Sequence, residues 1–269
     1  MKKSLIAVAL IGAFAAPAAV QTAMAAEEAA PAGPHTFTGN AGLFSEYRFR
    51  GIAQTFAKPA LQGGFDYSHE SGVYLGNWNS NVNSGAGFPE GNLEMDFYGG
   101  FKKSFGDFGV DVGGIYYYYP GTNFNGKTVK NGEVYLGASW KFISFKYYYA
   151  LTDYFNAKGP NGEKTDGTSY YDLGFNYDLG SGWGVNAHVG YLDFKKVQNA
   201  DYTDWKLGVT KDINGWVVGL SYIDTNAKGD CNKGQFYCFS NSLDAAGNFG
   251  SKTMNAGRAT GVLSISKSF

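Results

Sequence analysis

The sequence is poor in the residues that most often carry enzyme chemistry. Its 269 residues include two cysteines, three histidines and seven prolines, and the formal net charge is −1. No His/Cys cluster has the spacing of a metal site, and no Gly-x-Ser-x-Gly motif is present. A chain this close to neutral is also no basic nucleic-acid binder. We therefore expect no enzyme, no metal site, no cofactor and no nucleic-acid partner.

Long apolar runs are also scarce, because the single one lies at the N-terminus. Lys2 and Lys3 precede the apolar run from Leu5 to Val20, and a small-x-small pattern ends at Ala25. These are the parts of a secretory signal peptide, so we predict that residues 1–25 are removed and that 26–269 form one domain. Residues 26–36 are predicted to be a periplasmic lead. The remaining chain lacks the run of about 18 apolar residues that a spanning helix needs.

Aromatic residues and glycine are abundant. Phe, Tyr and Trp make up 17% of the chain, glycine occurs 39 times, and the mean hydropathy is −0.26. An exported, moderately polar chain of this kind is typical of a transmembrane β-barrel or of a secreted β-sandwich.

Alternation of apolar and polar residues recurs along the chain. For example, Leu93, Met95 and Phe97 alternate with Glu94, Asp96 and Tyr98. Such alternation over about 10 residues predicts a strand with one apolar face. The predicted strands are 37–50, 59–69, 72–82, 92–103, 107–119, 131–142, 144–155, 168–179, 183–194, 202–212, 215–225 and 257–269.

The links between these strands alternate in length. Those after even-numbered strands are short, whereas those after odd-numbered strands are long and polar; the longest is 226–256. Short periplasmic turns opposite long extracellular loops are the pattern of outer-membrane barrels. The sequence therefore predicts an all-β fold, a twelve-stranded antiparallel transmembrane barrel in the outer membrane, and disfavours the sandwich.

Glycine recurs once per predicted hairpin near the middle of a strand. The intervals are 34 to 37 residues, and the members are Gly64, Gly100, Gly137, Gly174 and Gly208. We expect these glycines to relieve crowding inside a small barrel rather than to bind a ligand.

Both cysteines, Cys231 and Cys238, lie in the longest predicted loop. Because an exported protein meets an oxidising compartment, we expect them to form a disulfide. The loop so closed either braces itself or folds into the barrel as a constriction.

The sequence has three arginines, which are Arg48, Arg50 and Arg258. All three have the parity of the barrel interior, and the predicted first and last strands must pair, so we expect them to form one basic wall. Glu94, Asp96 and Asp172 are expected on other strands, facing that wall across a narrow pore. The alternative is a plug of ion pairs that fills the lumen, with Arg48 bound to Glu46.

The segments Gly39–Ile52 and Gly72–Trp78, the export signal and the C-terminal Phe269 resemble the TorF-type porin family of proteobacteria. The resemblance covers nearly the whole mature chain, although Lys267 departs from the usual terminal pattern. It implies an outer-membrane barrel with channel activity, no named solute, and recognition of Phe269 by the outer-membrane assembly machinery.

Together these features predict passive diffusion of small polar solutes through a barrel surrounded by outer-membrane lipid. A non-conducting barrel that serves as a surface receptor or structural protein is the alternative.

Overall fold

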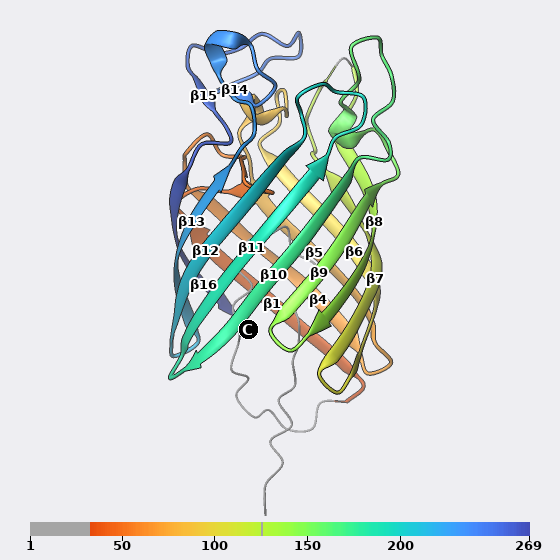
Figure 1. The fold of residues 1–269 in the computed structure, drawn as a ribbon, viewed down its shortest axis with the longest axis vertical. Helices are drawn as coiled ribbons and strands as arrows, with labels where there is room; N and C mark the ends of the chain where they lie inside the picture. The colour runs from red at the N-terminus through yellow and green to blue at the C-terminus, as the bar shows by residue number, and fades with distance from the viewer. Residues whose placement is uncertain (1–32, 125) are drawn as a thin grey trace, which may run out of the picture.

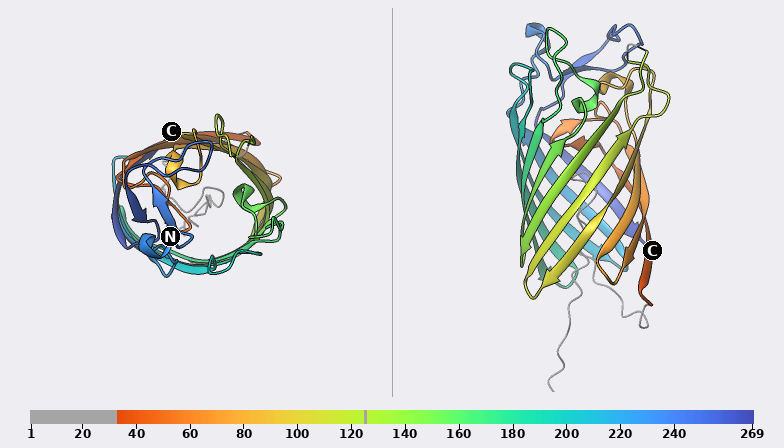
Figure 2. Two further views of the ribbon diagram at one scale, coloured as in Figure 1. Left: turned by 90° about the horizontal axis from the view of Figure 1, so that it is seen from above. Right: turned by 90° about the vertical axis from the view of Figure 1, so that its right-hand side faces the viewer.

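The computed structural model describes residues 33–124 and 126–269. The predicted signal peptide and most of the predicted lead lie outside these residues. Twelve antiparallel strands close into a barrel, in which β1 pairs with both β4 and β16 (Figures 1 and 2). This confirms the predicted fold class, and a closed barrel excludes the two packed sheets of a sandwich.

The barrel strands follow the chain around the wall, each paired with its neighbours in sequence. Their bounds are β1 His35–Phe44, β4 Ala60–His69, β5 Val73–Asn81, β6 Leu93–Phe105, β7 Phe108–Tyr118, β8 Lys130–Trp140, β9 Ile143–Ala150, β10 Ser169–Gly180, β11 Trp183–Asp193, β12 Tyr202–Ile213, β13 Trp216–Thr225 and β16 Thr260–Ser268.

Short turns join the strands at one end of the barrel, here called the lower end, and long links lie at the upper end (Figure 1). The long links carry short elements that alternation did not predict. These are β2 Arg48–Phe49, β3 Ile52–Ala53, η1 Ser84–Ala86, η2 Tyr154–Asn156, η3 Cys231–Lys233, β14 Cys238–Ser240 and β15 Thr253–Asn255.

Three predicted strand bounds are wrong. β1 ends at Phe44 rather than at residue 50, β9 ends at Ala150 rather than at residue 155, and β16 begins at Thr260 rather than at residue 257. The first strand also begins two residues earlier than predicted, at His35 rather than at residue 37. In each of the three cases the alternating pattern continues into a segment that is not part of the barrel wall. Alternation alone does not show at which residue the chain leaves the wall.

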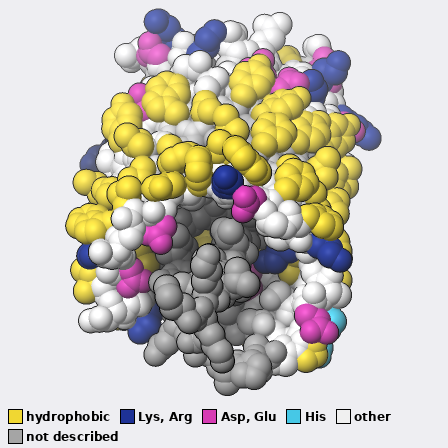
Figure 3. Space-filling model, turned by 60° about the horizontal axis from the view of Figure 1, so that its bottom comes forward, with side chains coloured by type: hydrophobic (Ala, Val, Ile, Leu, Met, Phe, Trp, Pro, Cys, Tyr) yellow, Lys and Arg dark blue, Asp and Glu magenta, His cyan; other side chains and the backbone are white. Residues whose placement is uncertain are grey.

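The outer surface of the barrel is apolar. Figure 3 shows hydrophobic side chains spread over the outer wall. Outward side chains at mid-strand are large and exposed, such as Leu61 at 69%, Leu136 at 61% and Leu207 at 60%. Aromatic rings lie above and below them. The upper ring includes Tyr116, Tyr149, Tyr171, Tyr191 and Tyr222, and the lower ring includes Phe105, Phe108, Trp140, Trp183 and Trp216.

Glycines on the inner surface make room for tyrosine rings and for neighbouring backbone. A Cβ added at Gly76 would lie 2.2 Å from the ring of Tyr98, and one added at Gly190 would lie 1.9 Å from the Tyr170 hydroxyl. The predicted crowding is found at the repeated glycines as well, since a Cβ at Gly64 would lie 2.1 Å from a neighbouring carbonyl. Interior glycine thus allows bulky rings to lie flat along the wall.

Within the described ranges, no helix is long and apolar enough to cross a membrane.

We predict that Gly190→Ala lowers the free energy of unfolding by about 1–3 kcal/mol, because the new methyl group displaces Tyr170. Gly261→Ala is the matched control, since a Cβ there meets nothing within 4 Å. Urea unfolding of the micelle-bound barrel, followed by tryptophan fluorescence, measures both. Equal stability of the two variants would contradict the close packing of Tyr170 on Gly190.

Candidate functional site in the upper lumen

The chain turns into the barrel after β1, and residues 45–59 are here called the inward segment. From Glu46 to Thr55 every residue is buried, whichever parity it has. A strand in the wall exposes alternate residues, so this segment has left the wall. The view from above shows this segment inside the ring of strands, and the side view places it in the upper part of the barrel (Figure 2).

The tip of the inward segment is a tight hairpin. β2 pairs with β3, and the two turn residues, Arg50 and Gly51, have φ angles of 49° and 77°. This is the left-handed conformation that two-residue hairpin turns require. Glycine is needed at the second position also for space, because a Cβ at Gly51 would lie 2.4 Å from the Thr225 side chain. Arg50 is therefore held at the tip in a conformation that non-glycine residues rarely adopt.

The guanidinium of Arg50 is bound on all sides. Its two terminal nitrogens donate to the two carboxylate oxygens of Glu133 on β8, at 3.0 and 2.7 Å. It also donates to the Tyr154 hydroxyl at 2.9 Å and stacks over the Tyr170 ring, 4.3 Å from its centroid. Arg50 is 4% exposed and Glu133 is 3% exposed. A forked, buried ion pair thus anchors the hairpin tip to the opposite wall.

Arg48 ties the inward segment to the last loop. It donates to Glu46 at 3.1 Å and to the backbone carbonyls of Gly51, Ala256 and Arg258 at 2.8 to 3.0 Å. Arg258 approaches the same Glu46 oxygen at 3.5 Å and is partly exposed. Two arginines therefore share Glu46. The contact between Arg48 and Glu46 is the one expected in the alternative of a lumen filled by ion pairs.

The predicted acidic wall takes part in the same packing. The Tyr47 hydroxyl of the inward segment donates to Glu94 on β6 at 3.2 Å. Asp96 on β6 is fully buried, and neither of its oxygens has a hydrogen-bond partner among the described residues. Asp172 on β10 lies apart from this packing and contacts Nδ1 of His188 at 3.0 Å.

The prediction that a basic wall and an acidic wall face each other across a pore is wrong in the upper lumen. None of the three arginines lies on a barrel strand, and Arg50 binds an acid directly instead of facing one across open space. The cause is the end of β1 at Phe44, which lets the following residues fold inward. The arginine and carboxylate groups then form direct ion pairs, instead of facing each other across an open lumen and creating an electric field there.

Several residues of the network were not singled out from the sequence. Glu133 is the partner of Arg50, and His188 lies between Asp172 and Asp204, at 3.0 Å from each. Lys146 and Asp111 form a further buried pair lower in the lumen, at 2.7 Å. All of them have interior parity, so the alternation of the sequence predicts that their side chains point inward. It does not predict the pairs, because each pair joins different strands and forms only when the barrel closes.

Below the inward segment, small polar residues dominate the inner wall. Interior positions of the lower strand halves carry mostly glycine, serine, threonine and asparagine. Examples are Asn40, Gly64, Gly100, Ser139, Ser144, Gly174, Asn176, Asn186, Thr210 and Ser266. Small side chains leave more room at the axis than the tyrosines above them.

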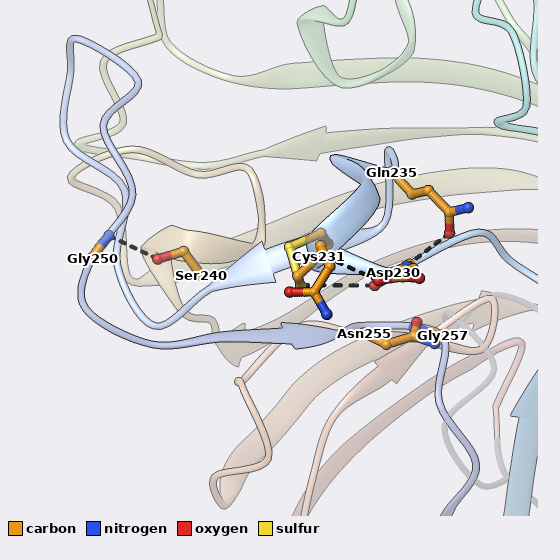
Figure 4. The surroundings of a disulfide bond; sticks show 10 residues. Asp230, Cys231, Gln235, Ser240, Gly250, Asn255 and Gly257 are labelled. Carbon is orange, nitrogen blue, oxygen red and sulfur yellow. Dashed lines mark hydrogen bonds between the residues drawn. A yellow bond between two sulfur atoms is a disulfide. The ribbon is translucent and has the colours of Figure 1, made fainter.

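The longest loop lies over the upper rim, with β14 and β15 above the barrel (Figure 1). Cys231 and Cys238 are joined by a disulfide beside η3, where Asp230 and Gln235 also bond to each other (Figure 4). The loop returns at Ala256, whose carbonyl accepts from the backbone of Ala53 at 2.9 Å. The loop therefore braces the inward segment from above.

In the part of the chain that the structure describes, no group of three or more His, Cys, Asp or Glu side chains could hold a metal ion.

Comparison with known proteins assigns the family. The profile of a family described as bacterial protein of unknown function, Gcw_chp, matches residues 28–246. The chain belongs to the Gcw_chp family. Among curated proteins no sequence matches it.

The solved structure of one porin supports the barrel fold of this Gcw_chp protein. It is similar to the NanC porin, with a TM-score of 0.50 and 10% identity over 87% of this chain and 99% of that chain. It also aligns with the P. putida toluene transporter TodX at TM-score 0.41 and 11% identity, over 89% and 91% of the two chains. An anion-selective porin from Comamonas acidovorans aligns at TM-score 0.36 and 14% identity, over 87% and 99%.

We predict that Glu133→Gln lowers the free energy of unfolding by about 3–5 kcal/mol, because it leaves the buried charge of Arg50 without a partner. Asp107→Asn is the control, since its pair with Lys141 is exposed and 3.9 Å long. That change should cost no more than about 1 kcal/mol. Urea unfolding measures both, and equal losses would show that the Arg50 pair does not anchor the hairpin.

Proposed function

We propose that this Gcw_chp protein is an outer-membrane channel for passive diffusion of small polar solutes. In this proposal the short turns face the periplasm and the long loops face outside. The predicted signal peptide delivers the chain to the periplasm, and the assembly machinery of the outer membrane recognises the C-terminal Phe269. The resemblance to TorF-type porins supports the same assignment.

The outer surface supports a lipid environment. A band of exposed apolar side chains surrounds the barrel between two rings of aromatic residues. Trp and Tyr rings favour the boundary between lipid headgroups and hydrocarbon, and an apolar band between two such rings is how membrane barrels meet lipid. In water the same surface would be a large exposed apolar patch, which soluble proteins avoid.

The observation that carries the channel proposal is the contrast between the two faces of the wall. The inner face is lined by hydroxyl, amide and charged groups and by glycine, whereas the outer face is apolar. Polar solutes and water need such a lining to cross hydrocarbon. The inward segment lies across this path and is proposed to be its constriction.

The alternative is a barrel that does not conduct and acts as a receptor or structural protein. One observation favours it: the inward segment is fastened by buried ion pairs to two different parts of the protein, with Arg50 bound to Glu133 and Arg48 bound to Glu46. A segment tied in this way can close the lumen at its height.

Single-channel recording in planar bilayers separates the two. Gln54 N donates to Tyr47 O at 2.9 Å, so these residues already lie side by side. Replacing residues 48–53 by two glycines closes a shorter hairpin between them. If the inward segment is the constriction, this variant should conduct several-fold more than the wild type, because the cross-section at that height increases.

Deletion of Ala245 and Ala246, in the outer loop, is the matched control and should leave conductance unchanged. Heat-modifiable gel mobility reports folding of all three proteins. Folded proteins that give no conductance steps, with or without the shortened hairpin, would overturn the channel proposal in favour of the non-conducting barrel.

The lipid contact makes a separate prediction. Leu207→Arg places a charge at the middle of the apolar band and should lower the free energy of unfolding in vesicles by about 2–4 kcal/mol. Phe249 is 55% exposed but lies in the outer loop, so Phe249→Arg is the control and should have little effect. Equal effects in the two variants would argue against lipid around β12.

A further inference from the structure

A cavity lies directly beneath the inward segment, against β1, β4, β12, β13 and β16. The hollow measures about 350 Å³, and part of it is open to solvent. Six polar or charged residues line the hollow: Glu46, Arg48, Gln62, Lys206, Ser221 and Ser264.

Three buried polar atoms in this lining have no hydrogen-bond partner among the described residues. They are Oε1 of Glu46, Nε of Arg48 and Oε1 of Gln62, in side chains that belong to residues 4 to 5% exposed. Buried polar groups in folded proteins are nearly always paired. Three unpaired atoms around one cavity therefore indicate that the cavity has a polar occupant.

Lys206 adds a second cation to the same lining. It stands on β12 and borders the cavity together with Glu46 and Arg48. Its Nζ has neither a hydrogen bond nor an ion pair within residues 33–124 and 126–269. The carboxylates of Asp172 and Asp204 attract its charge without forming a direct hydrogen bond or ion pair with it, so its three donors remain available to a ligand.

The free groups are of two opposite kinds. Arg48 Nε and Lys206 Nζ are cationic donors, which suit a carboxylate. Oε1 of Glu46 and Oε1 of Gln62 are acceptors, which suit an ammonium group. A simple anion would leave both acceptors unpaired and face the charge of Glu46, and a simple cation would face Arg48 and Lys206. A zwitterion with both groups close together satisfies all four.

We propose that this cavity is a binding site for the head group of a small zwitterionic amino acid. The carboxylate contacts Arg48 and Lys206, and the ammonium group contacts Glu46 and Gln62. The head group lies against these four side chains, and the side chain of the amino acid extends into the part of the hollow that is open to solvent. The proposal deepens the channel function and rests on it for the route by which a solute reaches the cavity.

The test is isothermal titration calorimetry on the purified mature protein in detergent micelles, with alanine, propionate and propylamine as probes. Alanine carries both charged groups, and each of the others carries one. We expect alanine to bind and each single-charge probe to bind about tenfold or more weakly, because one pair of lining groups is then left unpaired.

Lys206→Met removes the cation without breaking a direct hydrogen bond or ion pair among the described residues, and it should weaken alanine binding about tenfold or more. Lys211→Met is the matched control on the same strand, since Lys211 donates to the Ser181 carbonyl at the lower turn and is remote from the cavity. It should bind alanine as the wild type does. Gln62→Leu tests the contact with the ammonium group, and it should weaken the binding of alanine without weakening the binding of propionate.

The outcomes separate this site from the channel itself. A barrel that binds alanine but does not conduct keeps the site and overturns the channel. A conducting barrel that does not bind alanine overturns the site and shows that the cavity holds water alone. If propionate binds as tightly as alanine, the proposed contact of the ammonium group with Glu46 and Gln62 is wrong. If Lys206→Met binds alanine as tightly as the wild type does, alanine binds elsewhere.

Discussion

The buried pair between Arg50 and Glu133 is the constraint on which the upper half of the barrel depends. Removing two charges from water is costly, and their attraction repays this only with good geometry and further hydrogen bonds. Both conditions hold here, because the contact is forked and Tyr154 and Tyr170 complete it. The pair fixes the tip of the inward segment, and the segment in turn sets the position of Arg48, Glu46 and Tyr47.

This anchoring divides the lumen into two regions of different character. Above, tyrosines, ion pairs and the inward segment narrow the interior, and the disulfide loop braces them through Ala256. Below, glycine, serine and asparagine line the wall. The cavity at the boundary is bordered by groups from both regions, which is why its lining combines the ion pair of Arg48 and Glu46 with Lys206 from the wall.

The glycines of the inner wall serve this arrangement. A tyrosine ring that lies along the wall needs a neighbour without a side chain, as Tyr170 does at Gly190. The same ring then stacks against Arg50, and its hydroxyl donates to Asp204 at 2.9 Å. Loss of a single glycine would therefore disturb the ring and, through it, the anchor.

The sequence by itself determined the twelve strands, the face that each turns outward and the separation of short turns from long loops, because all of these follow from local alternation and turn residues. It also placed Glu46, Glu94 and Asp96 on the inside. Only the tertiary structure decided that β1 ends at Phe44 and that Arg50 meets Glu133, a residue 83 positions away. The end of β1 could not be predicted, because a strand in the wall and a segment buried on both faces can show the same alternation in sequence. The ion pair could not be predicted, because pairs between distant parts of the chain form only once the barrel has closed.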